Sequence, residues 1–174
     1  PDVEADEPPQ AVLLTTSGGL TSGDRLDIDI VARQGSRLTV STQAAEKLYR
    51  ALAGEPDAQV AVNLRVEPGA TLEWLAQETI LFDRSRLRRR IDVELSTDAR
   101  LLATESMVFG RSAMGERYES GRLHEAWRVR RNGRLIWADA LHLEGAMRAH
   151  RETAFAVGDA SACATLLYAG DDAA

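Results

Sequence analysis

The fold class is indicated first by the segment Arg25-Leu-Asp-Ile-Asp-Ile-Val-Ala32. Leucine and isoleucine alternate there with charged residues, and this period of two is typical of a strand with one buried face. The turn residues Gln34-Gly35-Ser36 follow, and a second β-prone run occupies 37–41. The sequence therefore predicts a hairpin over 25–41.

The same alternation recurs along most of the chain, and we find no internal repeat. Asn132-Gly133 gives the clearest hairpin signal, because both residues accept the positive φ of a type I′ turn. In that register Val129 faces Ile136. Arg128 then faces Trp137, where its guanidinium can lie over the indole. Further strands are predicted at 11–16, 60–66, 72–74, 91–95, 101–109, 127–131, 134–137 and 162–168.

One segment has a helical period instead. Within 43–53, apolar residues recur at i, i+3, i+4 and i+7, which predicts an amphipathic helix that ends at Gly54. The segment 145–159 is predicted as a second short helix or a loop. The whole pattern indicates a mainly β fold, with layered or wound antiparallel and mixed sheets and one clear helix. The apolar stripe consists of Ala45, Leu48, Tyr49 and Leu52.

Length and composition limit the class of protein. The 174 residues, 44% hydrophobic and 28% charged, favour a single globular domain, which is predicted as β-rich and placed at 11–174. The acidic, proline-containing segment 1–10 is predicted to be an exposed lead-in. A formal charge of -6 disfavours a dedicated nucleic-acid binder. The single cysteine, Cys163, excludes an internal disulfide. No apolar run approaches the roughly 18 residues that a membrane span requires.

Two glycine-rich segments have spacing close to that of a phosphate-binding loop. They are 110–116 and 18–24, and they place Glu116 and Asp24 where such a loop carries lysine. A carboxylate at that position would repel the phosphates. The sequence therefore argues against a nucleotide site in either segment.

A β-rich hydrolase is the alternative class of function. One cysteine and three scattered histidines do not supply the four spaced ligands of a closed zinc site, and the chain has no G-x-S-x-G elbow. Catalytic triads are set by geometry rather than spacing, so Ser112, in a glycine-flanked turn, stays a candidate nucleophile. A carboxylate pair is the other candidate for such an enzyme. The histidines are His124, His142 and His150.

Several carboxylates lie in apolar surroundings. Glu73 directly precedes Trp74, Glu78 lies within the segment 75–82, and Glu105 follows an apolar run. A buried acid is costly unless it is paired or hydrated. Each acid is therefore either paired with one of the many arginines or part of a polar passage or interface.

Four motifs carry a resemblance to a known family. The sequence resembles the urease accessory protein family UreD, called UreH in some organisms, because the motifs occur in that family's order and the likeness spans residues 11–143. The motifs are Ser17-Gly-Gly-Leu-Thr-Ser-Gly-Asp24, Ser41-Thr-Gln-Ala-Ala-Glu-Lys-Leu-Tyr-Arg50, Leu72-Glu-Trp-Leu-Ala-Gln-Glu-Thr-Ile-Leu-Phe-Asp83 and Glu105-Ser-Met-Val-Phe-Gly-Arg-Ser-Ala-Met-Gly-Glu116.

The resemblance implies a non-catalytic, cytoplasmic scaffold and metallochaperone with a β-rich fold. Such a protein binds UreF directly and the GTPase UreG through UreF, and the assembly docks on apo-urease. Nickel is then delivered to the urease active site while UreG hydrolyses GTP. No tightly bound cofactor, nucleic acid or membrane partner is implied, and nickel is bound only in transit. A degenerate adaptor that binds UreF without carrying metal is a further alternative.

The resemblance also suggests site residues. A water-filled passage through the protein is the nickel route proposed for the family, and its candidate lining here is Glu73, Glu78, Glu105 and Glu116. The motif residues expected to be structural or to form an interface are Gly18, Gly19, Gly23, Asp24, Gln43, Lys47, Tyr49, Arg50, Trp74, Gln77, Gly110, Arg111 and Gly115.

The chain departs from the family in three respects. Thr21-Ser22 stands where the family turn usually has Val-Gly, and Ala76 stands where it has Pro. Family members are also commonly longer than 174 residues. The chain therefore resembles a truncated core that lacks N- and C-terminal family segments.

Overall fold

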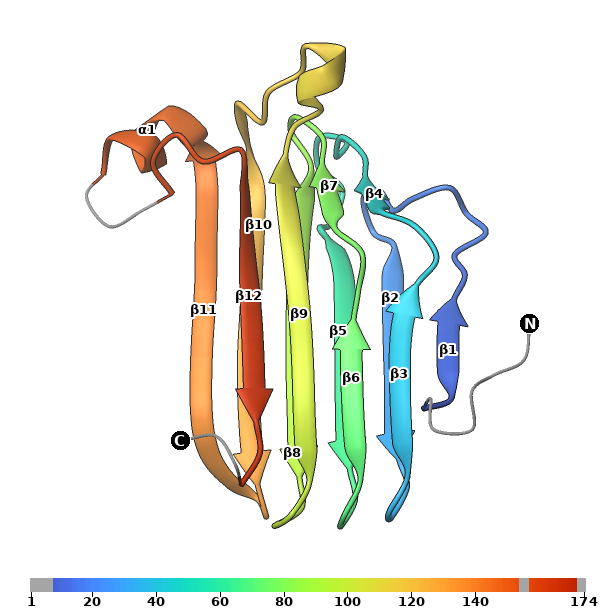
Figure 1. Cartoon of the computed structure of the whole chain (residues 1–174). Coiled ribbons are helices and arrows are strands. Elements are labelled where there is room, and N and C mark those ends of the chain that lie inside the picture. The colour runs from blue at the N-terminus through green and yellow to red at the C-terminus, as the bar shows by residue number, and fades with distance from the viewer. Residues whose placement is uncertain (1–7, 154–156, 172–174) are drawn as a thin grey trace.

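The chain folds into two β-sheets packed face to face (Figure 1). The computed structural model describes residues 8–153 and 157–171. The strands are β1 (Gln10–Leu13), β2 (Arg25–Ala32), β3 (Arg37–Thr42), β4 (Glu46–Leu48), β5 (Ala58–Val66), β6 (Thr71–Leu75), β7 (Thr79–Leu81), β8 (Arg86–Leu95), β9 (Arg100–Phe109), β10 (Ser120–Arg131), β11 (Arg134–Ala146) and β12 (Ala162–Ala169). A 3-10 turn, η1 (Ser112–Met114), and one short helix, α1 (Met147–Glu152), complete the described elements.

The two sheets differ in the order of their strands. The five-stranded sheet has the order β11-β10-β8-β5-β2. The seven-stranded sheet has the order β1-β3-β6-β9-β7-β4, with β12 paired to β9. Neighbouring strands are parallel throughout, except that β10 and β11, and β9 and β12, pair antiparallel.

Parallel pairing arises because the chain passes repeatedly from one sheet to the other. After β2 it crosses to β3 and β4 in the seven-stranded sheet and then returns to β5, which pairs with β2 as Ile28 pairs with Val62. Each coil therefore stacks on the one before, as in a solenoid. The turns stack as well, since the Gly35 N–H donates to the Pro68 oxygen at 2.9 Å and the Ser96 N–H to the Val66 oxygen at 3.0 Å.

This topology corrects the predicted hairpin over 25–41. β2 and β3 are both strands, with the expected alternating burial in β2, but they belong to different sheets. The predicted turn at Gln34-Gly35-Ser36 is present, but it connects β2 to β3 in the opposite sheet rather than to a neighbour in the same sheet. The sequence contains no repeat of residues, but the structure repeats a unit of strand, turn and strand.

The predicted helix over 43–53 is wrong. Glu46–Leu48 forms β4, which pairs in parallel with β7, and a loop follows. Leu48 alone of the apolar stripe is fully buried, while Leu52 is 66% exposed. Pairing with β7 satisfies backbone hydrogen-bonding groups of β4, and Leu48 is buried in the core. These tertiary contacts outweigh the local preference for a helix. The short helix α1 lies within 145–159 instead, as the second helical prediction allowed.

The hairpin at Asn132-Gly133 is confirmed. Both residues have positive φ, 51° and 75°, between β10 and β11. The register differs from the prediction by one residue, because an irregularity between Val129 and Arg130 places Val129 opposite Trp137. Trp137 consequently packs edge-on against Trp127, with ring centroids 6.0 Å apart.

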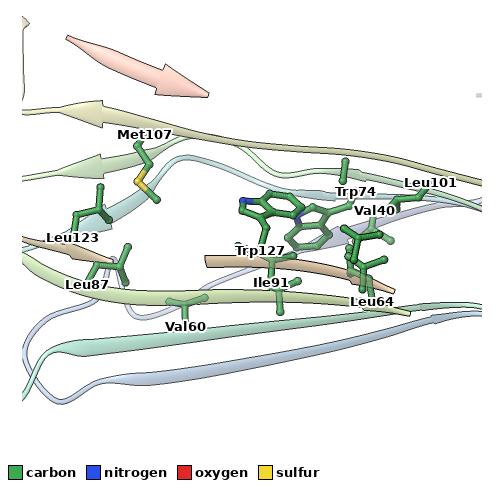
Figure 2. Packing of buried hydrophobic residues seen from close by; sticks show 14 of the residues in the cluster. Val40, Val60, Leu64, Trp74, Leu87, Ile91, Leu101, Met107, Leu123 and Trp127 are labelled. Carbon is green, nitrogen blue, oxygen red and sulfur yellow. The ribbon is translucent and has the colours of Figure 1, made fainter. Parts of the chain in front are cut away.

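The core lies between the two sheets. Trp74 from β6 and Trp127 from β10 fill its centre, and aliphatic side chains from both sheets surround them (Figure 2). In the described ranges, 8–153 and 157–171, no helix is long and apolar enough to cross a membrane.

Candidate functional site

The residues of the motifs gather in two places, and the first is one end of the sandwich. The loop 17–24, β4, the segment after β7 and η1 meet there (Figure 1). Leu20 and Leu48 form a β-bridge, and the Tyr49 hydroxyl donates to the Gly18 oxygen at 3.0 Å. We call this region the motif end. It brings together segments that are far apart in the sequence.

An aromatic and ionic cluster closes the motif end. The edge of Tyr49 meets the Phe82 ring, with centroids 5.0 Å apart. The Arg111 guanidinium lies 3.9 Å from the centroid of Phe82, and its Nε donates to Glu116 at 2.6 Å. The ion pair with Glu116 raises the pKa of Arg111. These contacts fix the loop around η1 over β7, and Met114 in that turn is 75% exposed.

Two glycines allow the close approach of these segments. A Cβ on Gly19, whose φ is 142°, would lie 2.6 Å from the Lys47 carbonyl oxygen. A Cβ on Gly110, whose φ is 86°, would lie 2.6 Å from the Glu116 carbonyl oxygen. No L side chain fits at either position without moving backbone. Close backbone approach therefore explains why glycine occupies these two motif positions.

The other motif residues surround the motif end or its approach. Asp24 caps its turn by accepting the Thr21 N–H at 2.8 Å, and the adjacent Gly23 donates to the Pro56 oxygen. Gly115 ends η1 with a left-handed backbone. Five of the predicted residues have exposed side chains: Gln43, Lys47, Tyr49, Arg50 and Gln77.

The second place is the interior, where β8, β9 and β10 contribute charged side chains. Arg89, Glu105 and Glu125 are 4%, 4% and 6% exposed. Arg89 Nη1 donates to Glu105 Oε2 and lies 3.6 Å from Glu125 Oε2. We call these three residues the buried triad. It holds two carboxylates and one guanidinium.

Both central tryptophans contact the triad. Trp74 Nε1 donates to Glu105 Oε1 at 2.8 Å, which gives the motif residue Trp74 a polar as well as a packing role. Trp127 Nε1 donates to Glu125 Oε1 at 3.3 Å. Arg89 also donates to the Thr79 hydroxyl.

The triad is incompletely satisfied. Glu125 Oε2 and Arg89 Nε have no hydrogen-bond partner within the described part of the chain. Burial raises the pKa of Glu125, Arg89 opposes that shift, and Glu105 adds to it. One cation thus serves two buried acids, so the interior holds excess negative potential.

Cavities adjoin the triad on both sides. One, of about 210 Å³, lies between β11 and β12 and is lined by Glu105, Glu125, Asp139, Cys163 and Thr165 among others. The other, of about 40 Å³, is lined by Glu105, Arg89, Thr79, Gln77 and Glu46 among others. Glu105 therefore borders both cavities, and polar groups continue from one to the other through the interior.

The structure separates the four predicted passage carboxylates. Glu105 is at the centre, but Glu73 lies on the outer face of the seven-stranded sheet and accepts the Thr39 hydroxyl at 2.6 Å. Glu78 is half-buried and its backbone oxygen accepts the Glu46 N–H, while Glu116 pairs with Arg111 at the motif end. Glu73, Glu78 and Glu116 line neither cavity.

Sequence reasoning missed Glu125, Arg89 and Glu46. Glu46 falls within the helix predicted over 43–53, yet it borders the smaller cavity, where burial raises its pKa. Arg89 and Glu125 each stand at an inward position of an alternating strand, and that position in the pattern was the available signal. Cys163 lines the larger cavity, and burial raises the pKa of its thiol.

The described part of the chain shows neither a preformed metal-ligand cluster nor a serine paired with a histidine. Within residues 8–153 and 157–171, no three His, Cys, Asp or Glu side chains are placed to hold a metal ion. Ser112 lies exposed in η1, whereas the histidines lie on β10, β11 and α1. None of the hydrogen bonds in the described ranges joins Ser112 to a histidine.

Comparison with known proteins identifies the family. A family model described as UreD urease accessory protein matches residues 1–174. The chain belongs to the UreD family. It is 51% identical over 174 residues to a urease accessory protein UreD of Magnetococcus marinus, covering 100% of this chain and 60% of that protein. It is 51% identical over 166 residues to one of Rhodopseudomonas palustris, covering 94% of this chain and 58% of that protein.

A third relative, the urease accessory protein UreD of Rhizobium leguminosarum, is 48% identical over 161 residues, covering 92% of this chain and 58% of the relative. The chain thus spans about 60% of the length of the curated relatives it matches. UreD proteins are named as accessory proteins rather than as enzymes. The family resemblance carried by the four motifs is confirmed.

Proposed function

We propose that the chain acts as a scaffold in urease maturation and helps nickel to enter the urease active site. It does so in a cytoplasmic assembly with UreF, which it contacts directly, with UreG bound through UreF, and with apo-urease. Membership of the UreD family supports the link to urease. The buried triad, with a cavity on each side, is the observation that supports a role in ion transfer.

The proposed route runs through the interior between the two sheets. Asp139 and Cys163 stand at the β11–β12 side, Glu125 and Glu105 at the centre, and Glu46 at the far side. Carboxylate oxygens and a thiol are suitable transient ligands for a divalent transition metal. Glu125 Oε2, buried and without a hydrogen-bond partner, is available to an ion in passage.

Energetics favour a functional origin for the triad. Replacing a buried ion pair by well-packed apolar residues is often neutral or stabilising, so such a cluster is weak evidence of a stabilising role. An excess buried carboxylate is worse still for stability. A cation that passes through the interior would be attracted by the same excess charge. The cluster is therefore better explained by ion transfer than by folding.

The motif end is the proposed contact with UreF. It carries an ordered loop with the exposed side chains of Lys47 and Met114 beside the Tyr49–Phe82–Arg111 cluster. Aromatic, methionine and arginine side chains are the types enriched in the centres of protein interfaces. Gly19 and Gly110 allow the segments of this surface to pack closely, so these two motif glycines fit a docking surface at the motif end.

The test is nickel loading of urease by the Glu105→Gln/Glu125→Gln variant. The chain is co-expressed with UreF, UreG and apo-urease, and nickel per urease active site is measured beside a UreF pull-down. Glu73→Gln is the matched control, because Glu73 lies on the outer face. We expect a loss of nickel with UreF binding retained, and normal loading by the control. Normal loading by the double variant would refute the passage and leave an adaptor without metal transfer.

A further inference from the structure

The outer face of the five-stranded sheet contains a hollow, on the side of β8 and β10 that faces away from the buried triad. Side chains of β2, β5, β8 and β10 surround a depression of about 210 Å³. Ala61 and Ala126 face outward on neighbouring strands on either side of Arg90. Their small side chains leave room between longer neighbours, so the sheet is hollowed there. We call this depression the basic hollow.

The basic hollow is rich in cations. Its outward-facing lining includes Arg25, Arg88, Arg90 and Arg128, against one acid, Asp27. Arg89 on the same strand points the other way, into the buried triad. The chain as a whole has a net charge of -6, so this concentration of arginine is local.

Two of these arginines are already neutralised and two are not. Arg25 pairs with Asp27 at 2.6 Å and Arg90 with Asp92 at 2.9 Å. Within the described ranges, Arg88 and Arg128 form no ion pair or hydrogen bond. His124 stands opposite Arg88 on β10, and its pKa is lowered, first by burial and then by Arg88, His142 and Arg128. The local field is therefore positive, and uncompensated guanidinium groups face solvent.

The spacing of the cations suits an extended chain. Arg88 and Arg90 stand two residues apart on β8, which separates their Cα atoms by about 7 Å. Arg128 stands opposite Asp92 in the parallel register of β10 and β8, so its Cα lies diagonally from that of Arg90, at roughly 8 Å. Alternate residues of an extended peptide repeat at the same interval of about 7 Å.

We propose that the basic hollow docks an acidic segment of a partner protein, in extended conformation, with carboxylates at alternate positions. Arg88 and Arg128 bind the outer two carboxylates, and Arg90 exchanges Asp92 for the middle one. Arginine's planar fork matches a carboxylate in two parallel hydrogen bonds. Ala61 and Ala126 leave room for the backbone of the segment.

Phosphate and nucleic acid fit this surface less well. A phosphate site typically presents free backbone N–H groups or a helix N-terminus, whereas the strands here use their N–H groups in the parallel ladder. A nucleic acid carries charge at every phosphate, and Asp27, Asp29 and Asp92 lie on the same outer face. A segment whose charges are spaced can avoid those acids.

The test compares two labelled six-residue peptides of identical composition, one alternating Glu and Ser and the other with three Glu followed by three Ser. We expect the alternating peptide to bind at least about threefold more tightly in fluorescence polarisation at low salt, because only its spacing matches the arginines. Equal affinity of the two peptides would overturn the proposal. Displacement by inorganic phosphate at equal concentration, or tighter binding of oligothymidylate, would also overturn it.

Variants test the location. Arg88→Glu/Arg128→Glu should weaken the alternating peptide about tenfold or more, since two attractive contacts become repulsive. Ala126→Glu, which places a carboxylate in the hollow and removes no arginine, should weaken it as well. Arg37→Glu/Arg117→Glu makes the same change in net charge at exposed sites elsewhere and should leave binding within about twofold. Equal losses in the two double variants would show binding by net charge alone and refute the site.

Discussion

Removal of Arg89 should destabilise the protein more than any change to an exposed arginine. Arg89→Met leaves Glu105 and Glu125 buried without their shared cation. Loss of one partner from a buried ion pair costs about 3–5 kcal/mol. With a urea dependence of about 2 kcal/mol per M, the unfolding midpoint should fall by roughly 2 M. Urea unfolding followed by tryptophan fluorescence measures this directly.

The matched control is Arg88→Met. Arg88 precedes Arg89 on β8, but its side chain is on the solvent face. Substitutions at such exposed positions usually change stability by less than about 0.5 kcal/mol. Adding Glu105→Gln to Arg89→Met should recover part of the loss, because one buried charge is then removed. Equal midpoints for the Arg88 and Arg89 variants would refute the electrostatic account of the triad.

The loss should also depend on pH. Burial already raises the pKa of Glu125, and Arg89 is the group that opposes the shift. A carboxyl whose pKa is higher in the folded state stabilises the fold at pH below its unfolded value and loses that contribution as pH rises through the folded pKa. The Arg89→Met variant should therefore be closer to wild type at pH 4.5 than at pH 7. A deficit that is the same at both pH values would contradict this reasoning.

Three further outcomes follow from the contacts. Gly19→Ala should destabilise the fold by about 1–3 kcal/mol in urea unfolding and Gly18→Ala by less, because only a Cβ on Gly19 meets backbone; equal losses would contradict the steric explanation. Arg111→Met should leave the urea midpoint nearly unchanged yet reduce co-purification with UreF, and full co-purification would exclude the Phe82–Arg111 cluster from that interface. Cys163 should react with iodoacetamide more slowly at pH 8 in the folded chain than in urea, because burial raises the pKa of its thiol; equal rates would contradict its burial.

Much of the strand content could be predicted because alternation in a two-layer sheet is a local property. The alternation in 25–32 gave β2 its bounds and its buried face, and Asn132-Gly133 gave a hairpin turn. The partner of each strand could not be predicted in this way. In a coiled parallel topology the partner of Ile28 is Val62, and no local pattern encodes that separation.

The false helix at 43–53 has a similar cause. A strand with one buried residue, Leu48, and two flanking loops can display apolar side chains at helical intervals by coincidence. β4 exists only because β7 and Leu20 supply hydrogen bonds from distant parts of the chain. Tertiary pairing therefore overrides the local preference.

The sequence predicted that the candidate site contains buried carboxylates, but it identified only some of the residues that supply them. The expectation that acids in apolar surroundings are either paired or part of a polar passage applies to Glu105, which is paired with Arg89 and also borders two cavities. Motif membership grouped Glu105 with Glu73 and Glu116, which lie on other surfaces. Glu125 lies outside the four motifs. The alternation in β10 indicates its inward position, but its neighbour Arg89 follows only from the pairing of β10 with β8.

A blocked cavity tests ion transfer through the interior most directly. Thr165 lines the cavity between β11 and β12, whereas Leu166, the next residue, is 74% exposed on the opposite face. Nickel per urease active site should be measured after maturation with Thr165→Phe and with Leu166→Phe, at equal UreF binding. We expect nickel to fall with Thr165→Phe alone. Full loading by both variants would contradict a route through this cavity.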